Sequence, residues 1–564
     1  MRSGFLSAIL FALIGSWAAT PLFAAAPADE AAVNERLAEF DGSRPGVVVG
    51  VVRHGELVYA RAVGMADLRF EVPFEIDTPT NIGSTAKQFT GMALALLHVR
   101  GELSLDDDVR KYLPGLPDFG ETVTLRHLAS HTSGYREFLN TLAIAGIRLD
   151  KGDWMTRRDV LAVVEHQPAL QNRPGEEWNY NNTGYALLAQ VIAKVTGKPF
   201  DQWVRGEIFQ PLGMNATRYR LAPDRIVPGA STGYGRLPDD EGYLEVRDLG
   251  AALGAGALYT TIGDMARWMI ELGRFELGGE RVRALMTTPY ELGNGESTDY
   301  GLGLFIDQWR GLVRWQHGGG DAGHRSVFHY YPEIDSGIMV FSNHHEIDDA
   351  FTRALAEAFL GDHLEAPESN DAGTGETAAP TDEPFSDDLF DRYIGRFELE
   401  IAPGFVLNFF RDGERYMTQA TGQPAVEITP VSATGFELVG VDARIVFDID
   451  DDGHAGSLTL FQNGEHRAVR LDEDEGGAVN LEPYLGRYFS AELETFYVVE
   501  SKDDKLVLRH RRLDPIILQH AVGDQFGGGF PVARLEFLRD DAGKVTGMQA
   551  GNGRARDIHF ERVE

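Results

Sequence analysis

Residues 81–96 of the chain read NIGSTAKQFTGMALAL, and the interpretation of the whole sequence depends on this stretch. The apolar residues from Phe89 to Leu96 recur at the spacing of one helical face. Ser84 therefore lies at the expected start of a helix, near the positive end of its dipole. Lys87 follows three residues later on the same face. The pair is typical either of a capping serine with an exposed lysine or of a nucleophile with its base.

The composition describes a globular protein and excludes several classes of partner. The chain has 564 residues, of which 43% are hydrophobic and 24% charged, and this length predicts two to four domains. Its formal net charge of −34 argues against nucleic acid and anionic lipid as partners, because both need clustered Lys and Arg. Cysteine is absent from the sequence, which excludes disulfides, thiolate metal sites and a cysteine nucleophile.

Residues 1–26 have the pattern of a secretory signal peptide. Arg2 supplies a positive start, an apolar segment runs from Phe5 to Trp17, and Ala24 to Ala26 offer small residues for cleavage. A membrane anchor is the alternative, but the apolar segment is short for a span of about 20 residues. We therefore expect an exported protein, periplasmic or secreted, without a stable membrane span after cleavage.

Composition also divides the rest of the chain. Residues 363–384 are rich in Pro, Gly, Ser, Thr and acidic residues, and they predict a flexible linker. Residues 27–362 before it have strand patterns at both ends and helical patterns between them, which predicts an α+β domain built on one mixed sheet. The strand patterns are at 47–52, 57–63, 312–315, 326–331 and 338–342, and the helical patterns at 85–100, 158–166, 183–196, 200–208 and 262–273.

The part of the chain after the linker repeats itself. YIGRF at 393–397 recurs as YLGRY at 484–488, and both copies consist of short alternating segments separated by turn residues. The spacing of the copies is too long for a solenoid repeat and fits a small domain. We therefore expect two antiparallel β-barrel domains, at 385–475 and 476–564, because closure into a barrel removes exposed strand edges.

Two further segments carry side chains suited to catalysis. Tyr180 and Asn182 lie on one short loop before a predicted helix, and a phenol near an ammonium loses its proton more easily, so Tyr180 is a candidate general base. The alternative is a packed aromatic with Asn182 as the helix cap. In WQHGGGD, His317 ends a strand, and the glycines after it allow a substrate to approach the backbone. The alternative is a hairpin turn with a polar histidine.

The order SxxK at Ser84, YxN at Tyr180 and HGG at His317 resembles the penicillin-recognising serine hydrolases. This superfamily includes class C β-lactamases, D-alanyl-D-alanine carboxypeptidases, related esterases and D-aminopeptidases. The resemblance covers about residues 40–360, and a layout with two C-terminal barrels is similar to that of D-aminopeptidases. Three more segments are similar to the family: LRHLASHTSG at 125–134, IFQPLGM at 208–214 and DMARW at 264–268.

The resemblance implies a serine β-lactamase type of α+β domain and a role for each motif. Ser84 would be the nucleophile that forms an acyl-enzyme, and Lys87 and Tyr180 would share the general acid and base work. The backbone N–H groups of Ser84 and Gly320 would form the oxyanion hole. The residues that orient the substrate would be Asn182, His317 and Gly319. The substrate would be a small molecule or peptide with an acyl group, and the resemblance implies neither a cofactor nor a metal.

The third motif departs from the Lys-Thr-Gly of class C β-lactamases. His317 and Gly318 replace the lysine and the threonine, and both of these groups suit a substrate carboxylate. We therefore expect an esterase or amidase that acts on substrates without a free carboxylate. A D-aminopeptidase or D-alanyl-D-alanine-type peptidase is the alternative. A non-catalytic sensor that binds peptidoglycan or another ligand is the alternative from a different class, and the sequence gives no oligomeric state.

Three weaker signals lie elsewhere. GGGFP at 527–531 in the second repeat is a candidate for a barrel loop that reaches over the active site, with a plain surface loop as the alternative. The run 343–349, NHHEIDD, has metal-ligand residue types, but Asp348 is expected to cap a helix. His131 is expected to be a structural hydrogen-bonding residue.

Overall fold

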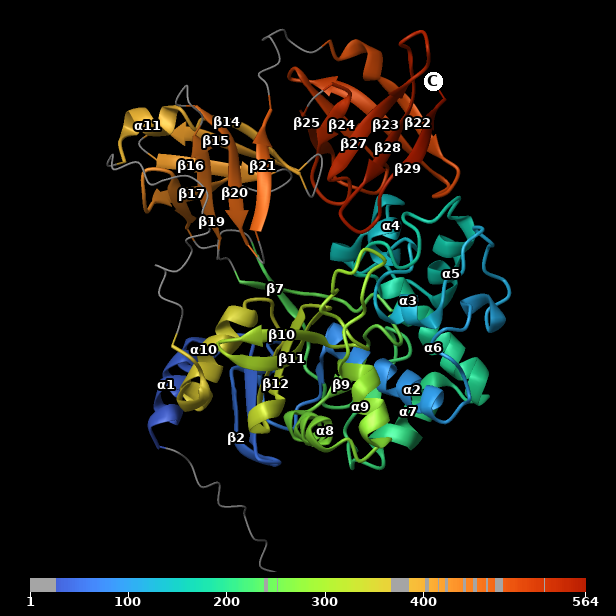
Figure 1. The fold of residues 1–564 in the computed structure, drawn as a ribbon, viewed down its shortest axis with the longest axis vertical. Coiled ribbons are helices and arrows are strands. Elements are labelled where there is room, and N and C mark those ends of the chain that lie inside the picture. Colours follow the sequence, from blue (N-terminus) through green and yellow to red (C-terminus); the bar gives the residue numbers. More distant parts are fainter. Residues whose placement is uncertain are drawn as a thin grey trace, which may run out of the picture.

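The computed structural model shows an α+β domain followed by two β-barrels, drawn in orange and red in Figure 1. This architecture confirms the predicted fold class. The predicted signal peptide, 1–26, and residues 367–384 of the predicted linker lie outside the described residues. The structure describes residues 27–237, 242–250, 252–366, 385–400, 405–413, 415–420, 425–439, 443–449, 454–462, 465–471, 480–521 and 523–563.

Six strands form the central sheet of the first domain. In order across the sheet they are β10 (Phe305–Trp309), β11 (Leu312–Asp321), β12 (His324–Tyr331), β13 (Ser336–Ser342), β1 (Val47–Arg53) and β2 (Glu56–Val63). The two ends of the domain meet in this sheet, since Val47 lies opposite Ser342. The expectation of a mixed sheet was wrong, because every pairing in it is antiparallel.

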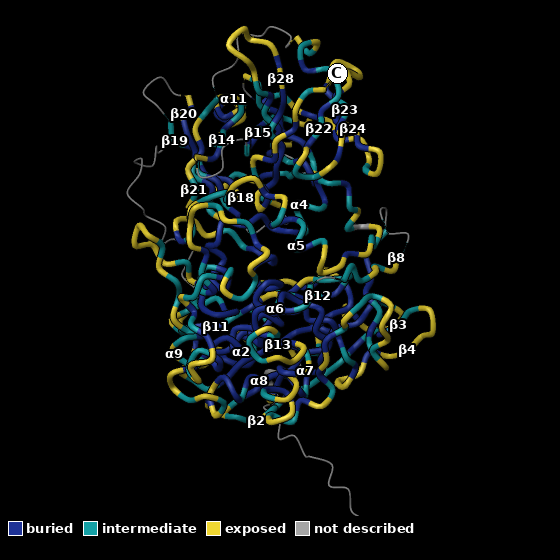
Figure 2. The backbone as a smooth tube through the Cα atoms, turned by 90° about the vertical axis from the view of Figure 1, so that its right-hand side faces the viewer, coloured by how far each residue is buried: buried dark blue, intermediate teal, exposed yellow. Residues whose placement is uncertain are grey.

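Helices cover both faces of the sheet: α1 (Pro27–Leu37) and α10 (Asp349–Leu360) on one face, and α2 (Lys87–Val99), α8 (Ile262–Arg274) and α9 (Gly279–Thr287) on the other. Successive side chains of a strand point to opposite faces, so Val49 packs with α1 and α10 whereas Val48 packs in the larger core around α2 and α8. Figure 2 shows this region, including α2, α8 and β13, in the dark blue of buried residues.

In the sequence, a helical region is inserted between strands β1 and β2 and strands β10 to β13, and it carries the YxN motif. Its helices are α3 (Leu125–Ala129), α4 (Phe138–Ile144), α5 (Arg157–His166), α6 (Asn182–Thr196) and α7 (Phe200–Val204). The predicted helix at 200–208 is α7 followed by a π-helical turn, Arg205–Phe209. The predicted helix at 85–100 is α2, which follows a 3₁₀ turn, η2, at Gly83–Ala86.

Small sheets complete the domain. β5 (Thr80–Asn81), β9 (Leu258–Thr260) and β6 (Arg218–Tyr219) form one; β3 (Met65–Asp67) pairs with β4 (Val72–Pro73), and β7 (Tyr234–Arg236) with β8 (Tyr243–Glu245). The first of these sheets holds the chain just before η2, and the backbone N–H of Ile82 extends it by donating to Leu258 O at 3.0 Å.

The repeats fold into two closed eight-stranded barrels. Short helix α11 (Asp387–Asp391) precedes the first barrel. The strands of the first are β14 (Gly395–Leu399), β15 (Val406–Asp412), β16 (Arg415–Ala420), β17 (Val426–Pro430), β18 (Gly435–Leu438), β19 (Arg444–Ile449), β20 (Ala455–Phe461) and β21 (Glu465–Arg470). Those of the second are β22 (Gly486–Ser490), β23 (Thr495–Lys502), β24 (Lys505–Arg509), β25 (Ile516–His520), β26 (Gln525–Gly527), β27 (Arg534–Arg539), β28 (Val545–Gly551) and β29 (Ile558–Arg562).

The second barrel docks on the helical region of the first domain, beside α4 (Figure 1). Ile144 at the end of α4 packs into the core of the barrel, and its carbonyl accepts a hydrogen bond from the Tyr497 hydroxyl at 2.9 Å. Arg136 forms an ion pair with Glu492 of the barrel, and both side chains are buried, at 5% and 7% exposed. Within the described part of the chain, no helix combines the length and apolarity needed to cross a bilayer.

Candidate active site

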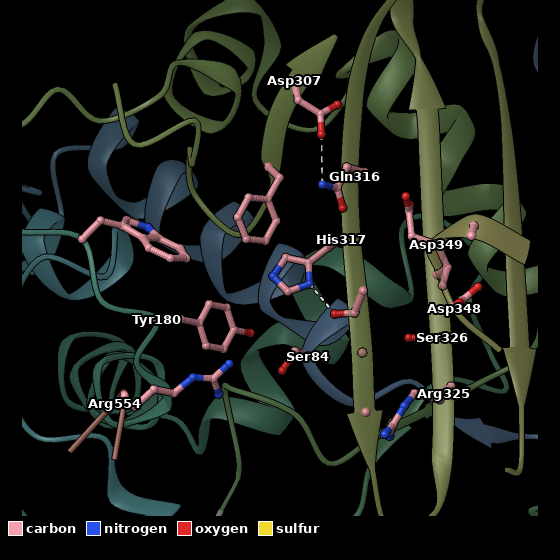
Figure 3. Close-up of a pocket in the computed structure, with 18 of the residues that line it drawn as sticks. Ser84, Tyr180, Asp307, Gln316, His317, Arg325, Ser326, Asp348, Asp349 and Arg554 are labelled. Carbon is pink, nitrogen blue, oxygen red and sulfur yellow. Dashed lines mark hydrogen bonds between the residues drawn. The ribbon is translucent and has the colours of Figure 1, made fainter. Parts of the chain in front are cut away.

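Ser84 lies in the 3₁₀ turn η2, directly before α2, and lines a cavity (Figure 3). Its side chain does not cap the helix, since α2 has no side-chain cap, so the capping alternative is wrong. Gly83 has a positive φ of 49°, and a Cβ atom there would lie 2.6 Å from the backbone nitrogen of Gly320. Only glycine permits this close approach of η2 to β11.

Asn81 fixes the turn from the side of β5. Its Oδ1 accepts a hydrogen bond from Gly83 N at 2.9 Å, and its Nδ2 donates to Asp321 Oδ2 at 3.0 Å. Burial raises the pKa of Asp321 to about 7. One buried amide thus ties the turn that carries Ser84 to the end of β11, a role that its position before Gly83 did not signal in the sequence.

Lys87 is completely buried and reaches back to the serine. Its Nζ donates to Ser84 Oγ at 2.9 Å and to the carbonyl of Ala255 at 2.9 Å. Burial lowers the pKa of Lys87 well below its ordinary value, and the negative charge of Glu137 acts in the opposite direction. A lysine with a lowered pKa gives up a proton readily, and neutral Nζ can then accept the Ser84 hydroxyl proton over the same contact.

Asn182 forms the next link. Its Oδ1 accepts from Lys87 Nζ at 2.7 Å, and its Nδ2 donates to Glu137 Oε1 at 2.9 Å. The alternative in which Asn182 caps the helix was wrong by one residue, because Asn181 is the cap and accepts from Gly184 N at 3.2 Å. Asn182 is the first residue of α6, which leaves its side chain free to orient the lysine.

Glu137 is a buried carboxylate that sequence reasoning missed. It caps α4, since Oε2 accepts from Asn140 N at 2.8 Å, while Oε1 faces Asn182. The sequence signal for it was weak, because a glutamate before a helix is usually a solvated residue of the first turn. Only the fold places this charge within two hydrogen bonds of the Lys87 ammonium.

Tyr180 lies over the lysine, with Lys87 Nζ 4.9 Å from its ring centroid. Burial raises the pKa of Tyr180, while contact with Ser84 and the positive charge of Arg554 act against that effect. The sequence led us to expect that a nearby ammonium would favour the phenolate, but burial outweighs the charge. Burial therefore favours the neutral phenol, which can donate a proton, and a part for Tyr180 in general acid or base work stays a prediction.

His317 lies on β11 and faces Tyr180 across the cavity, with ring centroids 6.2 Å apart (Figure 3). Its Nδ1 donates to Gly318 O at 2.6 Å, so Nε2 is unprotonated and accepts from the Tyr300 hydroxyl at 2.9 Å. Burial lowers the pKa of His317 to about 3. The histidine is neutral at ordinary pH and does not replace the positive charge of the family's lysine.

The glycines after His317 continue β11 as a strand instead of forming a turn. Gly318 is exposed in the cavity, whereas a Cβ on Gly319 would lie 2.0 Å from Ile82 O. β11 therefore packs directly against η2, and the backbone of Gly83, the residue before Ser84, lies close to that of Gly320. The roles of their N–H groups in an oxyanion hole, and of Gly319 in substrate binding, remain predictions.

The cavity beside Ser84 has a volume of about 1670 Å³ and is lined by all three domains. The first barrel contributes Phe461, Gln462 and Glu465, and the second contributes Gly553, Arg554 and Arg556. The loop predicted to reach the site, 527–531, does not line the cavity, so that prediction was wrong about the segment. The loop that does so joins β28 to β29, and the predicted loop supports it, since Asn552 Nδ2 donates to Pro531 O at 3.0 Å.

The weaker signals have structural explanations. His131 accepts from Asn181 N at 3.0 Å through Nδ1 and stacks near Tyr180, at 4.3 Å between ring centroids. Asp348 caps α10, accepting from Phe351 N at 2.8 Å. Among the described residues, no group of three or more His, Asp or Glu side chains is arranged to hold a metal ion.

Known proteins resemble the chain both over the first domain and over its whole length. Penicillin-binding protein 4* of Bacillus subtilis is 28% identical over 437 residues, which are 74% of this chain and 93% of that protein. A D-aminopeptidase of Cereibacter sphaeroides is 26% identical over 538 residues, 92% of this chain and 96% of that protein. The octameric penicillin-binding protein homologue from Pyrococcus abyssi has the same fold, with a TM-score of 0.54 at 24% identity over 78% of this chain and 99% of that one.

Residues 28–361, more than half of the chain, match the Beta-lactamase family. This range contains the buried Lys87, its contact with Ser84 and the third motif on β11. The motif order, the site geometry and this match agree that the chain belongs to the β-lactamase family of serine hydrolases.

Proposed function

We propose that the protein is an exported amidase or peptidase that cleaves acyl bonds next to D-amino acid residues through an acyl-enzyme on Ser84. The contact between buried Lys87 and Ser84 carries the proposal, because a lysine with a lowered pKa is a base that can activate a serine. Similarity to D-aminopeptidases extends through both barrels and supports the D-configured substrate. The pattern of residues 1–26 supports export.

The proposed acylation begins with transfer of the Ser84 proton to neutral Lys87 Nζ. Oγ attacks the substrate carbonyl, and the oxyanion forms between the backbone N–H groups of Ser84 and Gly320. Tyr180, a neutral phenol beside both groups, is placed to donate a proton to the leaving amine and to recover one from Lys87. Water then attacks the acyl-enzyme with the same groups acting in reverse, which releases the acid.

The size of the cavity supports an extended substrate rather than a small ester. Its volume of about 1670 Å³ exceeds the roughly 300–1,000 Å³ of sites that enclose drug-sized ligands. A peptide lying along β11 would fill more of this space than a simple ester. The sensor alternative has less support, since the Ser84, Lys87 and Asn182 contacts are complete.

Covalent labelling tests the proposal. A fluorophosphonate probe should label the purified protein, and Ser84→Ala should abolish labelling. Ser326→Ala is the matched control, because Ser326 also lines the cavity but donates to Ile82 O. D-Alanine p-nitroanilide or its N-acyl derivatives should be cleaved in preference to the L-forms. An unlabelled wild-type protein would refute the hydrolase, and a preference for L-substrates would refute the D-specific part.

A further inference from the structure

Arg554 of the second barrel projects into the cavity on the side of Tyr180 (Figure 3). Its loop is held by the backbone, since Arg554 N donates to Asn552 Oδ1 at 3.3 Å and its carbonyl accepts from Gln171 Nε2 at 3.3 Å. The guanidinium lies 4.8 Å from the centroid of the Tyr180 ring. A residue of the last domain is thus in contact with a predicted catalytic residue of the first.

The other arginines around the cavity have acidic partners. Their ion pairs are Arg314 with Asp307 at 2.8 Å, Arg353 with Asp349 at 3.1 Å, and Arg556 with Glu177 at 2.8 Å. Among the described residues, no carboxylate lies within ion-pair distance of Arg554, and no acceptor binds its guanidinium. Arg325 also lacks an ion pair in this part of the chain, but it donates to His324 O at 3.2 Å and packs against Gly320.

An unpaired guanidinium beside Ser84 determines which substrate charge the site accepts. Arginine keeps its proton at any ordinary pH and binds carboxylates with two parallel hydrogen bonds. Burial lowers the pKa of Lys87 and raises the pKa of Tyr180, and the positive charge of Arg554 acts to lower both pKa values. A substrate carboxylate would neutralise this charge, whereas a free ammonium group would be repelled.

We propose that Arg554 binds a carboxylate of the substrate, so that the enzyme acts on acidic acyl compounds rather than on peptides with a free amino terminus. This inference rests on the proposed hydrolase function and revises one expectation from the sequence. The third motif lacks a cation for a carboxylate, and the second barrel supplies one from the opposite side of the cavity. The carboxylate belongs to the acyl group or to the leaving group, and the substrates below distinguish these two sources.

The test compares five substrates, three p-nitroanilides and two esters, at equal concentration. N-succinyl-D-alanine p-nitroanilide carries a carboxylate on the acyl side, its N-acetyl analogue is neutral, and D-alanine p-nitroanilide carries an ammonium. An N-acetyl-D-alanyl ester of D-lactate places the carboxylate in the leaving group, with its methyl ester as the neutral reference. In the wild type, one of the two carboxylate substrates should exceed its neutral partner in kcat/KM by about tenfold or more.

Variants of Arg554 distinguish binding of the substrate carboxylate from an effect of the Arg554 charge on the pKa of Tyr180. Arg554→Ala should lower kcat/KM for the preferred carboxylate substrate by a larger factor than for its neutral partner, so that the preference is lost, and Arg554→Lys should restore part of the preference. Arg556→Gln is the control from the same loop, because its side chain pairs with Glu177, and it should keep the full preference. If Arg554→Ala slows every substrate by the same factor, Arg554 acts only through Tyr180 and the inference fails.

Protection of the fluorophosphonate reaction gives a readout that needs no turnover. N-succinyl-D-alanine or N-acetyl-D-alanyl-D-lactate, whichever carries its carboxylate on the preferred side of the cleaved bond, should slow labelling of the wild type and not of Arg554→Ala. Normal labelling without protection or preference would refute the carboxylate site and leave the hydrolase intact. Absence of labelling would instead refute the proposed function itself.

Discussion

At the scale of single residues, a chain of buried polar groups runs from Ser84 to Glu137. Lys87 Nζ donates to Ser84 Oγ at 2.9 Å and to Asn182 Oδ1 at 2.7 Å. Asn182 Nδ2 in turn donates to Glu137 Oε1 at 2.9 Å. Burial lowers the pKa of Lys87, and Glu137 raises it. The balance between desolvation and this distant charge decides how easily the lysine becomes a base.

Replacing Lys87 by arginine should remove activity while keeping a positive charge near Ser84. Arginine does not lose its proton, so it cannot accept one from the serine. We expect the rate of labelling by fluorophosphonate to fall by about 10²–10⁴, the usual contribution of a general base. A Lys87→Arg protein that folds normally by circular dichroism and still reacts at the wild-type rate would show that another group activates Ser84.

Replacing Glu137 by glutamine should shift the acid side of the pH–rate profile. The Glu137 charge raises the pKa of Lys87, so its removal lowers that pKa further. In the proposed mechanism Lys87 is the base in its neutral form, and the profile of kcat/KM should therefore fall at a lower pH than in the wild type. The cap of α4 would also weaken, at a cost of about 1 kcal/mol in the free energy of unfolding. If Glu137→Gln loses stability but its pH profile of kcat/KM does not move, Glu137 only caps α4 and does not act on Lys87.

At the scale of elements, the position of Ser84, the proposed nucleophile, depends on the contact between β11 and η2. The pattern at 312–315 predicted only the start of β11, because three glycines and a histidine have no strand propensity of their own. Pairing with β12 extends the strand to Asp321, and close contact with η2 demands the glycines.

The difference between local sequence patterns and long-range packing explains what the sequence could not predict. Strands and helices with regular apolar spacing were predictable, because burial of one face imposes that spacing. The motifs gave Ser84, Lys87 and Tyr180, but the local signal for Glu137 is weak and Arg554 has none. Their roles come from long-range packing, in which α4 and a barrel loop approach residues far away in the chain. The choice of loop 527–531 over the β28–β29 loop failed for the same reason.

Two neighbouring glycines test how strictly β11 must contact η2. A Cβ on Gly319 would lie 2.0 Å from Ile82 O, whereas one on Gly318 would meet nothing closer than Ser326 O at 3.8 Å. Gly319→Ala should therefore push β11 away from η2, the turn that carries Ser84, with a loss of about 1–3 kcal/mol in stability and a slower labelling reaction. Gly318→Ala is the matched control and should melt near the wild-type temperature. Equal melting temperatures for the two variants would contradict the packing argument.

At the scale of the whole molecule, the second barrel lines the cavity beside Ser84 instead of merely extending the chain. It supplies Arg554 to the cavity, and it also holds Arg136, the residue directly before Glu137, through the buried ion pair with Glu492. Arg136 additionally donates to the carbonyl of Arg556 and to Gln171 Oε1 at 3.2 Å. The docking of the barrel, the start of α4 and the lysine network are therefore mechanically linked.

Glu492→Gln tests this link, with Arg512→Gln as its control at the same interface. Removing the Glu492 charge leaves Arg136 buried without a counter-ion, which costs about 3–5 kcal/mol when a buried pair is broken. The pair between Arg512 and Asp153 is more exposed, with 39% of the arginine side chain accessible, and such pairs contribute about 0–1 kcal/mol. Glu492→Gln should therefore raise hydrogen exchange in α4 and lower the acylation rate, whereas Arg512→Gln should change neither. If exchange in α4 rises and acylation stays at the wild-type rate, the barrel stabilises the helix without influencing the lysine network.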